Sequence, residues 1–246
     1  MRADPEPGEQ RGCYYQELGT TSITPQKAFS SSIGSKFLIA LTGLLLFLFL
    51  VSHLAGNLLF ILGPDAFNHY SHTLISNPLI LVAEVGLLAI FALHLVKTVW
   101  LFAANRGARP ERYAAHKWAK NKNDRSRKSL SSTTMILTGT ITLLFVMTHL
   151  VTFKYGPYYQ TAEGIRDLYR LQLAVFSHPG YVAFYLLCMT VIGFHLWHGI
   201  SSAAQSFGLD SPQWTPRIIW TGRLLTAVIT AGFALLPVYT FIVGRN

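Results

Sequence analysis

The chain has 246 residues, of which 51% are hydrophobic and only 13% are charged, and its formal net charge is +9. Soluble domains carry about 25% charged residues and disordered chains combine low hydrophobicity with high charge, so neither class fits this composition. The two cysteines, Cys13 and Cys188, are too few for a disulfide scaffold or for a four-cysteine iron–sulfur cluster within this chain. No C-x-x-C-H motif is present, which excludes haem attachment through thioethers.

Residues 1–35 form a mixed polar segment that precedes five apolar stretches. Each stretch reaches the length of about 20 residues that a helix needs to cross a bilayer. The five predicted spans occupy residues 36–62, 78–104, 131–153, 180–206 and 217–243. Backbone in lipid must satisfy its own hydrogen bonds, and no alternating segments typical of a β-barrel are visible. The sequence therefore predicts an all-α integral membrane protein with five transmembrane helices.

Lysine and arginine are distributed unevenly between the predicted loops. The loop after the second span holds nine of the 20 lysines and arginines, whereas residues 63–77 hold none. The positive-inside rule then places the N-terminal segment and this loop in the cytoplasm and the C-terminus outside, in the cell inner (cytoplasmic) membrane. A basic loop could bind RNA, but beside a span it is typical of a topology signal and of contact with anionic lipid. No nucleic-acid partner is therefore expected. Residues 165–176 are predicted to form a short amphipathic helix on the outer surface.

One histidine lies within each of the first four predicted spans. They are His53, His94, His149 and His195. Ionisable side chains are costly inside a membrane, so such residues are candidates for function. At a rise of about 1.5 Å per residue, His53 and His149 lie roughly 26 Å from the inner ends of their spans, and His94 and His195 roughly 15 Å. The sequence thus predicts an outer pair and an inner pair.

The first and third spans share a pattern. Thr42 and Gly43 precede His53, and Thr138 and Gly139 precede His149, with eleven residues from threonine to histidine in both spans. The second and fourth spans match more weakly around their histidines. Parallel repeats are a known membrane architecture. The pattern predicts a duplicated helix pair followed by a fifth helix.

Two imidazoles that face each other at one depth can fill both axial positions of a haem b iron. The pair His53 and His149 therefore predicts an outer haem, and the pair His94 and His195 an inner haem, about 11 Å apart in depth. A zinc site is disfavoured, because two histidines without a carboxylate or thiolate are a poor ligand set. Hydrogen-bonded packing or proton relay remains an alternative role for such histidines. His198, three residues after His195, could also replace it as a ligand.

Several motifs are spread along residues 30–243. They read SIGSKFLIALTGLLLF, HLAGNLLF, GPDAFNHYSHTL, LHLVKTVW, FHLWHGISSAAQSFG and TPRI. Together they resemble the cytochrome b subunit of succinate:quinone oxidoreductases and fumarate reductases, of the single-subunit, five-helix, two-haem type. In that family the haem ligands lie on the first four helices, at positions that match the four histidines here.

This resemblance implies a membrane anchor that docks a flavoprotein carrying FAD and an iron–sulfur protein on its cytoplasmic side. Electrons would pass between the partner iron–sulfur clusters and a membrane quinone, typically menaquinone, and succinate oxidation would occur in the partner flavoprotein. Some members carry a glutamate two residues before the fourth ligand, where this chain has Gly193, which disfavours that proton path. Two alternatives stay open: the cytochrome b subunit of a hydrogenase, formate dehydrogenase or nitrate reductase, and a haem-free transporter or scaffold.

Polar residues toward the inner ends of the spans are candidate contacts of haem propionates or quinone. Lys97, Arg223 and His198 could pair with propionates, while the alternative for Lys97 and Arg223 is extension of the charged group to the cytoplasmic surface. Three residues near the start of the first span could line an inner quinone site. They are Ser31, Ser35 and Lys36.

Three candidates lie on the outer side. His69 and His72 fall in the loop after the first span, where they are either surface residues or contacts of an outer quinone or propionate site. Glu84 lies in the outer half of the second span. Because burial raises the pKa of a carboxyl group, Glu84 could exchange protons with quinone, or it could be a hydrogen-bonded packing residue.

Overall fold

The computed structural model describes residues 31–108, 134–209 and 211–245. Most of the predicted N-terminal segment and the greater part of the basic loop lie outside these residues. Within the described ranges the chain is helical, with one isolated bridge between Gln160 and Arg166. The all-α prediction is thereby confirmed for this part of the chain.

Five helical segments are long and apolar enough to cross a membrane, as predicted. They are Ser32–Leu62, Leu79–Gly107, Met135–Lys154, Pro179–Ser206 and Thr215–Val243. The first comprises α2 (Ser32–Leu58) and a 3₁₀ turn, η2 (Leu59–Leu62); the third comprises α6 (Met135–His149) and a π-helical turn, η3 (Leu150–Lys154). The others are α4 (Leu79–Gly107), α8 (Pro179–Ser206) and α9 (Thr215–Val243).

The first helix begins at Ser32 rather than at residue 36. The side chain of Ser31 accepts a hydrogen bond from the backbone N–H of Gly34 at 3.0 Å, which satisfies one of the free donors at the helix start. This cap extends the helix into the segment that the hydropathy pattern assigned to the polar N-terminal region.

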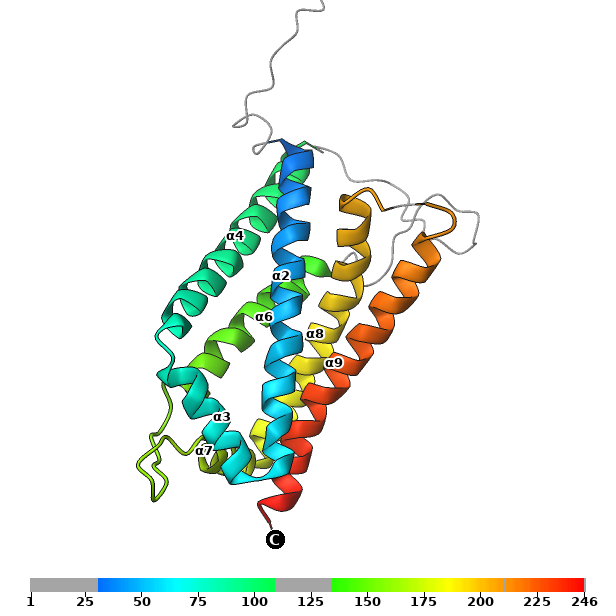
Figure 1. Ribbon diagram of the computed structural model, residues 1–246. Coiled ribbons are helices and arrows are strands. Elements are labelled where there is room, and N and C mark those ends of the chain that lie inside the picture. Colours follow the sequence, from blue (N-terminus) through cyan, green and yellow to red (C-terminus); the bar gives the residue numbers. More distant parts are fainter. Residues whose placement is uncertain (1–30, 109–133, 210, 246) are drawn as a thin grey trace, which may run out of the picture.

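Two shorter helices lie at one end of the bundle. α3 (Pro64–Ser76) occupies the stretch that was predicted as a loop, whereas α7 (Leu168–Phe176) corresponds to the predicted amphipathic segment. Pro64 at the first helical position and Asp65 in the first turn favour a helix start there. We call the end with α3 and α7 the lower end, and the end where α2 begins the upper end, as they appear in Figure 1.

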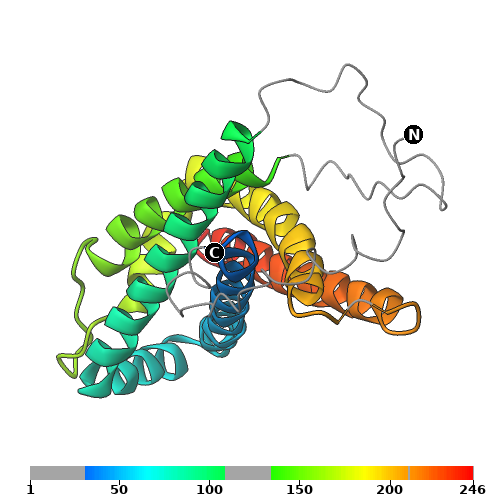
Figure 2. The same cartoon turned by 90° about the horizontal axis from the view of Figure 1, so that it is seen from above.

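The membrane-spanning helices pack around α2 and α8. α2 contacts α4, α8 and α9, while α8 contacts α6 and α9. Seen from above, α4 and α6 lie to one side of α2 and α9 lies to the other (Figure 2). No described residue of α4 is fully buried, so this helix is covered mainly where it meets α2.

A side-chain network joins α3 to α7 at the lower end. Asn68, only 2% exposed, donates from Nδ2 to Oδ1 of Asp167 at 2.8 Å, and its Oδ1 accepts from the backbone N–H of Tyr169 at 3.0 Å. Oδ1 of Asp167 also accepts from the N–H of Arg170 at 2.9 Å and thereby caps α7. The buried amide of Asn68 therefore donates one hydrogen bond to the start of α7 and accepts another from it.

We expect Asn68→Leu, which keeps the branched shape of the side chain but removes its polar groups, to lower the free energy of unfolding by about 1–3 kcal/mol, because the N–H of Tyr169 loses its acceptor. Denaturant unfolding of the detergent-solubilised chain measures this loss. His72→Ala, an exposed change on the same helix, is the control. If the two variants were equally stable, the network would contribute nothing to the lower end.

Candidate functional site

The two lower histidines lie side by side. His53 comes from α2 and His149 is the last residue of α6, and their ring centroids are 5.9 Å apart with the planes at 90°. Metal–imidazole bonds are about 2 Å long, so a metal ion bound between two imidazoles places the ring centres about 6 Å apart. Both rings are only half-buried. The spacing of this pair thus fits two ligands of one metal ion.

Each lower histidine stacks on a phenylalanine of its own helix. Phe49 stacks on His53 with centroids 5.2 Å apart, and Phe145 stacks on His149 at 5.7 Å. Both phenylalanines stand four residues before the histidine, which brings the rings onto one helix face. These phenylalanines were not predicted from the sequence, although their signal is present as Phe-x-x-Ser-His and Phe-x-x-Thr-His.

The two lower rings have different polar neighbours. The Nδ1 atom of His149 lies 3.4 Å from the hydroxyl oxygen of Tyr185 on α8. His53 is approached by Asn57 of its own helix, whose Nδ2 lies 3.4 Å from Nδ1 and 3.5 Å from Nε2 while it donates to the His53 carbonyl at 2.8 Å. Tyr185 and Asn57 were not identified from the sequence.

The upper histidines are each anchored by a threonine of the neighbouring helix. Nδ1 of His94 on α4 lies 3.0 Å from Oγ1 of Thr42 on α2, and Nδ1 of His195 on α8 lies 3.2 Å from Oγ1 of Thr138 on α6. The threonines noted as markers of a repeat therefore contact histidines of the adjacent helices.

The threonine hydroxyls also contact backbone carbonyls of their own helices. Oγ1 of Thr42 lies 2.7 Å from the carbonyl oxygen of Leu38, and Oγ1 of Thr138 lies 3.1 Å from that of Met135. When the threonine donates to this carbonyl, its oxygen accepts from Nδ1–H of the histidine. In a neutral imidazole this leaves the lone pair on Nε2 available to bind a metal ion.

Glycines bring the helices close at both upper histidines. A Cβ atom at Gly43 would lie 3.2 Å from Cε1 of His94, and one at Gly139 would lie 3.4 Å from Cε1 of His195. Both glycines directly follow the anchoring threonines. The Thr-Gly pair therefore supplies a hydrogen-bond acceptor together with the space that the ring occupies.

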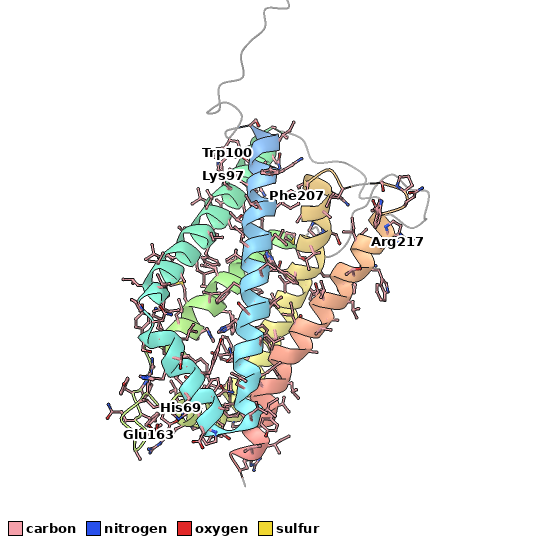
Figure 3. The ribbon with its side chains drawn as sticks, viewed as in Figure 1. His69, Lys97, Trp100, Glu163, Phe207 and Arg217 are labelled. Carbon is pink, nitrogen blue, oxygen red and sulfur yellow. The ribbon has the colours of Figure 1, made fainter. Side chains whose placement is uncertain are left out.

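The charged candidates of the upper end are placed against tryptophans. The amine of Lys97 lies 5.8 Å from the ring centre of Trp100, near the upper end of α4 (Figure 3). The guanidinium of Arg223 lies 5.0 Å from the ring centre of Trp197. A cation–π contact stabilises the charged group beside the aromatic ring, and tryptophan is a typical residue of the membrane interface. His198 is half-buried and close to the ring of His195.

The other upper candidates lie at the start of α2. Ser31 caps the helix and Lys36 is exposed. Ser35 is fully buried, and its hydroxyl has no hydrogen-bond partner among the described residues. Of these three, Ser35 is therefore the one with a buried polar group still to be satisfied.

Two of the three lower candidates contact a charged side chain. Glu84 on α4 pairs with Lys154 of η3 at 2.6 Å, a partner that neither interpretation of Glu84 named. His69 and Glu163 lie together at the lower end, 3.5 Å apart and mostly exposed (Figure 3). His72 is exposed on α3. The structure therefore places His69 and His72 on the surface and pairs Glu84 with η3.

Within the ranges that the structure describes, no group of three or more histidine, cysteine, aspartate or glutamate side chains could hold a metal ion. Structural zinc uses four protein ligands, so the histidine pairs do not form such a site. Haem iron needs fewer, because the porphyrin supplies four nitrogens and the protein only the axial ligands. A pair of histidines is therefore the protein ligand set that a six-coordinate haem requires.

No protein-family model, curated protein or solved structure matches the chain. Its function must therefore be inferred from its own residues.

Proposed function

We propose that this chain is the dihaem cytochrome b membrane anchor of a succinate:quinone oxidoreductase. His53 and His149 would hold one haem b, and His94 and His195 the other, within a duplicated helix pair. The observation that carries the proposal is the anchoring of three of these four rings through Nδ1 by hydroxyl groups of neighbouring helices. A histidine held in this way presents Nε2 as a ligand.

The bound haems would supply one-electron transfer. The residues of the chain would bind and orient them: the threonines fix the upper rings, and the stacked phenylalanines exclude water from the lower pair. With the N-terminal segment in the cytoplasm, the upper end, where α2 begins, would face the cytoplasm and meet the flavoprotein and iron–sulfur partners. Menaquinone is the expected substrate in the membrane. The motifs along residues 30–243 support this choice among quinone-linked complexes.

Purification of the full chain from haem-sufficient cells tests the proposal. We expect a low-spin b-type spectrum and about two haems per chain, because each histidine pair provides two axial ligands. Co-purified flavin, and haem that succinate reduces, would support the succinate-linked complex. Nickel or molybdenum in the partner would identify a hydrogenase, formate dehydrogenase or nitrate reductase instead, and a preparation without haem would favour a transporter or scaffold.

A further inference from the structure

Tyr185 stands in a fixed position beside the lower histidines. It is 5% exposed and makes edge contacts with Phe145 at 5.1 Å, Phe176 at 5.0 Å and Phe153 at 6.1 Å between ring centres. These rings come from α6, α7 and η3, so elements on several sides hold the phenol in place. Packing of the ring therefore fixes the direction of the Tyr185 hydroxyl group even without a hydrogen bond.

One contact decides the role of that hydroxyl. Its oxygen lies 3.4 Å from Nδ1 of His149. If Nε2 of His149 is the ligand of the lower haem, Nδ1 carries the ring proton and the Tyr185 oxygen accepts it.

A wide turn follows His149 and positions Phe153. The backbone N–H of Tyr155 donates to the carbonyl of Leu150 at 3.0 Å, a spacing of five residues that defines a π-turn. The guanidinium of Arg166 donates to the carbonyls of Phe153 at 2.9 Å and Lys154 at 3.3 Å and so closes the end of this turn. The turn therefore holds the ring of Phe153 against that of Tyr185.

We propose that Tyr185 is a positioning residue for His149. Tyr185 accepts the Nδ1 proton of His149 and keeps Nε2 free, which is the task that threonines perform at the upper pair. This inference rests on the proposed function. A hydrogen-bond acceptor on Nδ1 makes an imidazole ligand more basic and so favours ferric iron. Tyr185 would therefore lower the midpoint potential of the lower haem alone.

The test compares variants of the full chain in lipid bilayers. We expect Tyr185→Phe to retain both haems and to raise the midpoint potential of the lower one. At a fixed ambient potential, the ferrous-to-ferric ratio of that haem should rise about threefold to tenfold. Tyr181→Phe, one turn away and 43% exposed, is the matched control. Unchanged potentials, or equal shifts of both haems, would overturn the proposal.

A second measurement separates this inference from the proposed function. If the unaltered chain binds no haem, the proposed function fails, and the tautomer of His149 is then read by nitrogen NMR of ¹⁵N-histidine-labelled protein. His149→Ala assigns the signal. We expect the Nδ1–H form in the unaltered chain and a mixture of tautomers in Tyr185→Phe. The same tautomer population in both proteins would reject the positioning role whether or not haem is present.

Discussion

His149→Ala is expected to reduce the haem content from about two to about one per chain, because it removes one axial ligand of the lower pair. The remaining haem should keep a low-spin spectrum, since the upper ligands His94 and His195 come from other parts of the bundle and retain their threonine anchors. Pyridine haemochrome assay measures the haem content, and electron paramagnetic resonance distinguishes the two haems by their g values.

The reciprocal variant makes this test specific. His195→Ala should remove the haem that His149→Ala spares, and the double variant should contain none. His198→Ala is the control for the alternative ligand, because His198 lies one turn from His195 on α8. Haem loss in His198→Ala but not in His195→Ala would show that His198, one turn further along α8, is the upper ligand. Retention of both haems in His149→Ala would refute the pairing.

Gly43→Val is expected to empty the upper site while leaving the lower one filled. The new Cβ atom would lie 3.2 Å from Cε1 of His94, and the two added methyl groups need further space beside the ring. Overpacking of this kind costs about 1–3 kcal/mol or displaces the neighbour. Displacement would break the hydrogen bond between His94 and Thr42, so the haem content should again fall to about one per chain.

Leu44→Val provides the matched control, since it places the same side chain at the next position, where the native residue is 42% exposed. Gly139→Val should reproduce the loss through His195, with a smaller effect because the approach there is 3.4 Å. If Gly43→Val kept both haems and their spectra, the ring of His94 would not be confined as the structure indicates.

The membrane spans could be predicted because composition alone determines them. Long apolar runs without aspartate have no stable alternative to a helix in lipid, and all five are helical. α3 was missed because its stretch is short and mixes polar and apolar residues. It is a helix because Phe67 and Asn68 are buried against neighbouring elements, which no local pattern reveals.

The histidines could be identified from the sequence, but their partners could not. Thr42 and Thr138 were visible only as elements of a repeat, because their contacts depend on how far each helix is rotated against its neighbour. Tyr185 comes from a third helix and carries no motif. The ion pair of Glu84 with Lys154 likewise joins α4 to the end of α6, although the two belong to different helix pairs.

The order of the histidines along the chain has a consequence for biogenesis. α2 and α4 carry His53 and His94, and α6 and α8 carry His149 and His195, so each successive helix pair would contribute one ligand to each proposed haem. Neither proposed haem could then be bound before both pairs are made. Insertion of the two porphyrins would reinforce the direct packing of α2 on α8 after translation.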